Sequence, residues 1–140
     1  MQPPTIPPGE ARRYASVHVF LVGVRSLIGP NAPAALFERA VAGMARLHKE
    51  SYIKTVEASL GFNRLADLPK IEAPTLLVYG EHDTLTPPGV GQRMLEEIKG
   101  ARMTVIEDSG HLMNMEQPAR FNAAVLDFLR EHRDQASVAP

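Results

Sequence analysis

Hydrophobic residues in the first half of the chain recur at helical spacing. Residues 11–28 are rich in Val, Leu and Ala and end at Gly29-Pro30, a pair that is typical of a helix terminus. Asn31 is predicted to be the N-cap of a second helix, with Pro33 in its first turn. The apolar residues of this helix share one face because they lie three or four positions apart: Phe37, Val41, Met44 and Leu47.

A third helix is expected from about Ser51. Gly61 is predicted to end it, because glycine readily adopts the left-handed conformation found at helix C-termini. The apolar stripe of this helix consists of Ile53, Val56 and Leu60. No strand pattern interrupts the three helices, so the first half of the chain is predicted to be helical.

The pattern changes near Pro69, where short apolar runs begin to alternate with amphipathic stretches. Residues 73–80 form a continuous apolar run bounded by Pro and Gly, which is typical of a strand buried in a parallel sheet. Pro87-Pro88 opens a helix, residues 102–107 form a second strand, and Pro118 starts a last helix. This order predicts a βαβα unit in which the two strands are adjacent and parallel and the crossover is right-handed. The apolar positions of its two helices are Val90, Met94, Leu95 and Ile98, and then Phe121, Val125, Phe128 and Leu129.

Together these patterns predict an α/β protein in three parts. Residues 1–64 form a helical region with a Pro-rich start, residues 65–132 contain the βαβα unit, and residues 133–140 form a flexible tail. Two parallel strands with their helices leave an exposed sheet edge and an open apolar face.

Composition narrows the function without identifying it. The 140 residues are 44% hydrophobic and 22% charged, with 15 Lys and Arg against 16 Asp and Glu, so the net charge is −1. This balance argues against nucleic acid or an anionic membrane as the main partner, because both need a concentrated basic face. The absence of cysteine excludes disulfides, thiolate zinc sites and cysteine nucleophiles. No secretory signal or membrane-length apolar stretch is found, and we expect a cytoplasmic protein.

Candidate chemistry lies in the two loops that follow the predicted strands. Residues 80–88 include Asp83, and residues 108–114 include His111. Carboxyl ends of adjacent parallel strands meet at one edge, so we predict a hydrogen-bonded Asp83–His111 pair. Such a carboxylate fixes the imidazole tautomer and leaves the other ring nitrogen to act as a base. Taken singly, an Asp in this place is more often a turn or cap residue, and a lone His is more often structural.

Two motifs in this order resemble the C-terminal part of the α/β-hydrolase superfamily. Residues 74–83 followed by Thr86-Pro87-Pro88 resemble the segment that carries the catalytic acid. Gly110-His111, followed by Glu116-Gln117-Pro118 and an amphipathic helix, resembles the catalytic-histidine loop and final helix. The motif at residues 111–118 is most similar to that of the 3-oxoadipate enol-lactonase-like and esterase branch of the superfamily. The helical first half resembles the cap, or lid, that these enzymes insert before the acid-bearing strand. Because the resemblance covers only this lid and the last two strands, it implies an incomplete α/β-hydrolase fold.

This resemblance implies a hydrolase acting on a small-molecule ester or lactone without a metal or organic cofactor. A serine would attack a carbonyl carbon, His111 would take its proton, and Asp83 would orient His111. The resemblance thus assigns catalytic roles to Asp83 and His111 and leaves the particular substrate open.

The nucleophile is not recognisable in the sequence. Its elbow requires Gly-x-Ser-x-Gly at a sharp turn from strand to helix, upstream of the acid. None of the serines that precede Asp83 has this setting: Ser16, Ser26, Ser51 and Ser59. Ser26 has glycines three residues away on each side and lies in a helical run, which disfavours it. Ser109 follows the acid and is expected to make a hydrogen bond within its loop.

Three explanations for the missing elbow stay open. The chain is a fragment of a longer gene product, one half of a split enzyme completed by a second polypeptide, or a non-catalytic remnant. We expect the isolated chain to be inactive and to self-associate, or to bind a complementing N-terminal half. The alternative function is a non-catalytic binding or oligomerisation module derived from a hydrolase.

Two further patterns carry weaker predictions. His82 beside Asp83, with His111 nearby, suggests a metal site, but zinc needs three or four well-placed ligands and no helical His-x-x-x-His is present. Met113 and Met115 follow the histidine and are predicted to fill the core or to line an acyl pocket.

Overall fold

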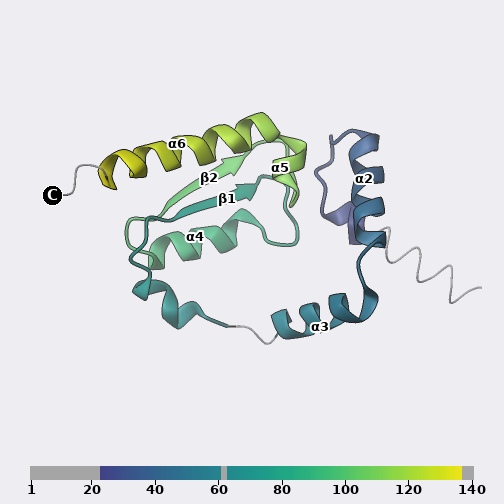
Figure 1. Ribbon diagram of the computed structural model, residues 1–140, viewed down its shortest axis with the longest axis horizontal. Coiled ribbons are helices and arrows are strands. Elements are labelled where there is room, and N and C mark those ends of the chain that lie inside the picture. Colours follow the sequence, from purple (N-terminus) through teal and green to yellow (C-terminus); the bar gives the residue numbers. More distant parts are fainter. Residues whose placement is uncertain (1–22, 61–62, 137–140) are drawn as a thin grey trace, which may run out of the picture.

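A parallel two-stranded sheet forms the centre of the C-terminal part of the chain in the computed structural model, which describes residues 23–60 and 63–136. Strand β1 (Leu76–Gly80) pairs with β2 (Arg102–Ile106), with Leu76 opposite Arg102 and Gly80 opposite Ile106. Helix α4 (Pro88–Glu97) lies on one side of the sheet and α6 (Pro118–Ala136) on the other (Figure 1). The predicted parallel βαβα unit is therefore confirmed.

The ends of these elements follow local chemistry. Pro88 begins α4, where the fixed φ of proline suits a first turn and its missing N–H is not needed. Gly100 lies between α4 and β2 with a φ of 75°, a left-handed conformation that glycine adopts without strain. Leu77, Ile98 and Ile106 are buried between the sheet and its helices and form this part of the core.

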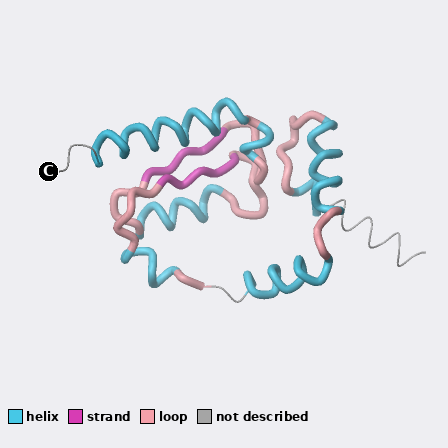
Figure 2. Tube along the Cα trace, viewed as in Figure 1, coloured by secondary structure: helices cyan, strands magenta, loops and turns pink. Residues whose placement is uncertain are grey.

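The predicted lid region contains a second apolar cluster, which lies beside the carboxyl ends of the strands (Figure 2). Residues 23–26 are helical, and α2 (Ala34–Ala45) packs against them. The buried residues of this cluster are Val24, Ile28, Leu36 and Ala40. Leu112 and Met115, from the segment that follows β2, pack against the same cluster. The lid core therefore includes residues on both sides of the predicted division between cap and βαβα unit.

Helix α3 (Lys49–Leu60) contributes nothing to either core. It has no buried residue, and its predicted apolar stripe faces solvent, with Leu60 84% exposed. The helix begins two residues before Ser51, and Gly61 lies outside the described residues. A short 3-10 helix (Leu65–Lys70) then leads into the sheet.

The predicted start of α2 is wrong. Pro33 is the N-cap residue and Asn31 does not cap the helix, because its side-chain amide donates to Asp108 Oδ1 at 2.7 Å. Leu47, predicted on the apolar face of this helix, lies beyond its end and is exposed. A contact across 77 positions in the chain has thus outweighed a local capping preference.

Two differences concern the C-terminal segments. A one-turn helix, α5 (Met113–Glu116), precedes α6 and was not predicted. Helix α6 continues through Ala136, past the predicted start of the tail at residue 133, and residues 137–140 lie outside the described part. Val90 and Leu129, predicted on apolar faces, are exposed. The division of the chain at residue 64 stays a prediction, and residues 11–22 of the first predicted helix are not described.

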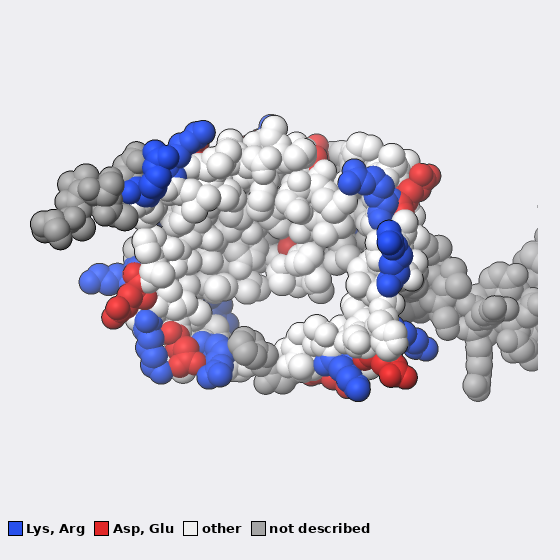
Figure 3. Space-filling view, in the orientation of Figure 1, with Lys and Arg blue, Asp and Glu red and all other residues white. Residues whose placement is uncertain are grey.

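Charged side chains lie mainly around the margin of the face shown in Figure 3, with both signs intermixed. The same face is hollowed between α3 and the sheet unit. None of the helices in the described ranges is long and apolar enough to cross a membrane.

Candidate active site

The loops that follow β1 and β2 lie against each other through backbone contacts. The amide of His82 donates to the carbonyl of Ser109 at 2.8 Å, and the amide of Glu81 donates to that of Ile106 at 3.0 Å. Gly80 is buried where the loops meet, and a Cβ at this position would overlap the carbonyl oxygen of Gly110. Glycine therefore permits the close approach that brings the two loops together.

Asp83 is fixed by the turn that follows it. Its side chain is buried, with 3% of the residue exposed. Oδ1 accepts hydrogen bonds from the amides of Leu85 and Thr86, each at 2.9 Å, and Oδ2 accepts one from the Thr86 hydroxyl at 2.7 Å. These contacts form an Asx-type turn, so the ordinary role of an Asp after a strand is also present here. The turn holds the carboxylate in place independently of His111.

The predicted contact between Asp83 and His111 is present. His111 Nδ1 lies 2.9 Å from Asp83 Oδ2, and the histidine side chain is 36% exposed. A carboxylate accepts hydrogen bonds but cannot donate them, so Nδ1 must carry the proton. Nε2 makes no hydrogen bond to any of the described residues, so it is the nitrogen able to accept a proton.

The electrostatics of the site keep Asp83 ionised. Burial alone would raise the pKa of the carboxyl. Hydrogen bonds from the Thr86 amide and hydroxyl, from His111 and from the Leu85 amide outweigh burial and hold the pKa of Asp83 below its usual range. Burial, and next the Asp83 carboxylate, raise the pKa of Tyr79 on β1. Tyr79 therefore stays neutral near pH 7 while Asp83 stays charged.

No serine of the described residues completes a triad with this pair. The hydroxyl of Ser26 donates to the carbonyl of Gly23 at 2.7 Å. Ser109 is fully buried and donates to the carbonyl of Ile106 at 2.8 Å, which confirms the predicted hydrogen bond within its loop. Ser16, the earliest serine considered, lies outside the described residues.

Two residues of the site were not predicted from the sequence. Thr86 donates to Asp83, and its hydroxyl oxygen lies 3.2 Å from His111 Nδ1. The spacing of Asp83 and Thr86 is that of an Asx or ST turn and could have indicated this contact. Glu116 binds the amide of Gly110, immediately before His111, at 2.9 Å. No local signal indicates that contact, because it depends on how α5 folds back.

A cavity of about 640 Å³ adjoins the acid loop. Leu27, Met44 and Tyr52 contribute to its mainly apolar wall, and Leu85, whose amide binds Asp83, lines it from the other side. Lys49 is the one charged residue among those described that line it. The volume lies in the range of small-molecule binding pockets. Met113 and Met115 do not line it, and Met115 packs in the lid core instead.

The predicted metal alternative finds no support in the geometry. His82 Nε2 lies 3.7 Å from Glu81 Oε2, whereas His111 is bound to Asp83. Across the described ranges, no group of three or more His, Cys, Asp or Glu residues could hold a metal ion.

The model of the alpha/beta hydrolase family matches residues 1–124. The chain belongs to this family. Its 2-hydroxy-6-oxononadienedioate/2-hydroxy-6-oxononatrienedioate hydrolase relative from Klebsiella pneumoniae is 36% identical over 101 residues. That match covers 68% of this chain and 34% of the relative, so the chain spans about a third of the length of this hydrolase.

Solved structures of the family share the fold. An esterase from Exiguobacterium antarcticum superposes with a TM-score of 0.73 at 24% identity, over 86% of this chain and 45% of the esterase. Est816, described as an N-acyl homoserine lactone degrading enzyme, superposes with a TM-score of 0.69 at 25% identity, over 88% of this chain and 52% of its own. The βαβα unit and the helical region before it thus correspond to part of the α/β-hydrolase fold.

Proposed function

We propose that this chain provides the catalytic acid, the catalytic base and the lid of a serine-type hydrolase. The observation that carries the proposal is the 2.9 Å contact between His111 Nδ1 and the buried Asp83 carboxylate. Asp83 orients the ring and stabilises its positive charge, and Nε2 is the base. The nucleophile is a serine on an elbow that a further segment contributes, so this chain by itself does not hydrolyse substrate.

The reaction that fits this geometry is acyl transfer to water. The serine oxygen bonds to the substrate carbonyl carbon while its proton passes to Nε2 of His111. The imidazolium then returns that proton to the leaving group. In the second half, Nε2 takes a proton from water, whose oxygen attacks the acyl-enzyme carbonyl carbon. The imidazolium then returns this proton to the serine oxygen as the ester bond breaks, which releases the acid and restores the free serine. A base positioned in this way contributes about 10²–10⁴-fold to the rate.

The substrate class is a small carbonyl compound with an apolar body. The cavity beside Leu85 has room for such a molecule, and Lys49 provides a countercharge for a substrate carboxylate. The names of the Klebsiella hydrolase and of Est816 add an oxo-dioate and a lactone to the simple esters as classes to be tested. The substitution Lys49→Met is expected to weaken the binding of substrates that carry a carboxylate more than the binding of neutral substrates. Lys54→Met, on the same helix, is the control.

A chimera tests the catalytic roles. The part of the Klebsiella hydrolase that precedes its match with this chain is fused to this chain and assayed on esters, lactones and the oxo-dioate. We expect turnover that falls by at least about 10³-fold on His111→Ala, with His82→Ala as the matched control. A folded chimera without turnover, or one that is unaffected by His111→Ala, would contradict the proposal. The unfused chain is expected to be inactive on all three classes.

A second candidate function is a non-catalytic module that binds a second copy or a complementing half. It is favoured by the exposed apolar side chains of α3 and by the sheet, in which each described strand is paired on one edge only. Addition of the Klebsiella N-terminal part as a separate polypeptide distinguishes the two functions. Binding with turnover supports the hydrolase, whereas binding without turnover supports the module.

A further inference from the structure

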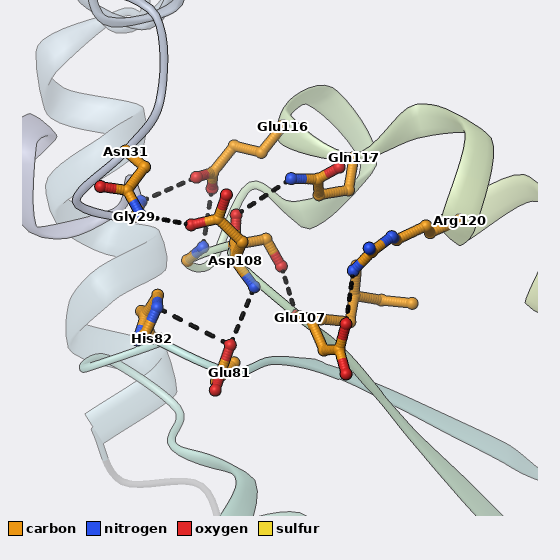
Figure 4. Close-up of polar contacts among 12 residues, drawn as sticks. Gly29, Asn31, Glu81, His82, Glu107, Asp108, Glu116, Gln117 and Arg120 are labelled. Atoms are coloured by element: carbon orange, nitrogen blue, oxygen red, sulfur yellow. Dashed lines mark hydrogen bonds and ion pairs between the residues drawn. The ribbon is translucent and has the colours of Figure 1, made fainter.

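We propose that Glu116 is a positioning residue that couples the lid to the candidate base, His111. This inference rests on the proposed function, because it takes His111 as the group to be positioned. Glu116 is the last residue of α5, and its two carboxylate oxygens bind amides from different parts of the chain. Oε2 accepts from Gly29 of the lid at 2.8 Å (Figure 4). Oε1 accepts from Gly110 of the histidine loop at 2.9 Å.

The two glycines are packed so closely against each other that neither position leaves room for a side chain. Both are buried, and a Cβ on Gly110 would lie 2.6 Å from the amide nitrogen of Gly29. Buried amides need acceptors, and Glu116 supplies one oxygen to each. Hydrogen bonds to an ionised carboxylate are stronger than those between neutral groups, so one side chain fastens both backbone segments.

His111 is consequently held by the lid on both of its sides. Gly110, before it, is bound through Glu116. Leu112, after it, donates its amide to the carbonyl of Leu27 at 3.2 Å, and the Leu112 side chain packs on the lid cluster. The ring itself is partly exposed, and among the described residues only Asp83 and Thr86 contact it through Nδ1. The backbone position set by Glu116 therefore decides whether Nδ1 reaches the fixed carboxylate of Asp83.

Neighbouring contacts reinforce this connection between lid and loop. Asn31 donates to Asp108, and Gln117 donates to the Asp108 carbonyl at 3.2 Å (Figure 4). Asp108 has a φ of 53°, an uncommon conformation for a residue with a side chain. The loop is thus held in a defined bend that begins at Asp108. Glu116 stabilises this bend because it accepts the Gly110 amide hydrogen bond.

The test uses the full chain labelled with ¹⁵N and compares Glu116→Gln and Glu116→Ala with the wild type by NMR. We expect the Gly29 and Gly110 amides of the Ala variant to shift and to exchange about tenfold faster or more. Gln retains one carbonyl oxygen, so one of the two amides should stay protected. In both variants the ring ¹⁵N shifts of His111 are expected to lose the pattern of an imidazole protonated at Nδ1, which is the ring signature measured here. Glu107→Gln is the matched control, because Glu107 pairs with Arg120 at the surface and should alter none of these signals.

Two outcomes would overturn the proposal. Unchanged Gly29 and Gly110 amides would show that Glu116 does not bind them. Changed amides with an unchanged His111 ring signature would show that Glu116 supports the fold without positioning the base. If the Ala variant unfolds, the nearly isosteric Gln variant decides between these results. The ring signature does not depend on turnover, so failure of the proposed hydrolysis in the chimera is distinguishable from failure of this coupling.

Discussion

At the scale of single residues, Asp83 combines two roles that are usually considered alternatives. Its Oδ1 closes the local turn by accepting hydrogen bonds from the amides of Leu85 and Thr86. Its Oδ2 accepts hydrogen bonds from the Thr86 hydroxyl and from His111. The turn bonds span two or three residues, so they can form with the loop itself and fix the carboxylate before the histidine loop docks. A preformed, buried carboxylate is what an orienting acid requires.

Replacement of Asp83 by Asn should invert the tautomer of His111 while leaving the turn intact. The Asn oxygen can still accept from the two amides, whereas its NH₂ group would donate to Nδ1 and leave the proton on Nε2. In the chimera, kcat should fall by about 10⁴-fold, because the base then carries the proton it should accept. Ring ¹⁵N shifts of His111 measure the tautomer directly. Asp127→Asn, at an exposed ion pair with Arg130, is the control, and an unchanged His111 tautomer in the Asp83 variant would contradict the prediction.

The low pKa of Asp83 also predicts how stability depends on pH. Because its pKa is lower in the folded state than the usual 3.8, Asp83 stabilises the fold fully above that value. This contribution is lost as the pH falls through the folded pKa. Asp83→Asn should therefore lower the free energy of unfolding by about 1–3 kcal/mol at pH 7 and by progressively less below about pH 4. Urea unfolding between pH 3 and 7 measures the difference, and a constant difference across this range would refute the prediction.

At the scale of elements, the predictable parts are those whose signals are local. The strands and helices of the βαβα unit were predicted because Pro, Gly and apolar runs mark their ends within a few residues. Their parallel pairing then placed Asp83 and His111 together. Helix α5 and the role of Asn31 were missed because both depend on contacts with segments more than 70 positions away. The periodicity of α3 predicted a helix correctly but could not say whether its apolar stripe is covered.

Gly80, at the carboxyl end of β1, lies so close to the histidine loop that no side chain should fit at this position. Gly80→Ala would place a Cβ over the Gly110 carbonyl oxygen and 2.7 Å from that of Ser109. We expect a loss of about 1–3 kcal/mol in the free energy of unfolding, measured by urea titration. Gly89→Ala is the control, because a Cβ there meets nothing within 4 Å and alanine favours the first turn of α4. Equal stability of the two variants would show that the loops are not in contact.

At the scale of the whole molecule, two apolar cores lie on either side of one short segment. Leu77, Ile98 and Ile106 form the core of the sheet unit, whereas Val24, Ile28, Leu36 and Ala40 form that of the lid. The segment from His111 to Glu116 lies between them and contributes Leu112 and Met115 to the lid core. The candidate base therefore sits where the two parts of the molecule meet, and its geometry depends on both being folded.

The exposed apolar stripe of α3 predicts that the isolated chain associates with itself. Ile53, Val56 and Leu60 lie on one face of the helix and are 43%, 40% and 84% exposed. Removal of such a surface from water by a second copy is favourable, at about 25 cal/mol for each Å² of apolar area. We expect sedimentation velocity to show a weight-average mass that rises with concentration, and a double substitution Ile53→Glu and Val56→Glu to reduce it toward the monomer. Lys54→Glu with Glu57→Lys changes charges on the same helix without touching the stripe and should leave association intact. A wild-type chain that stays monomeric at all concentrations would show that the stripe does not drive association, and a response only in the charge control would assign association to the polar face.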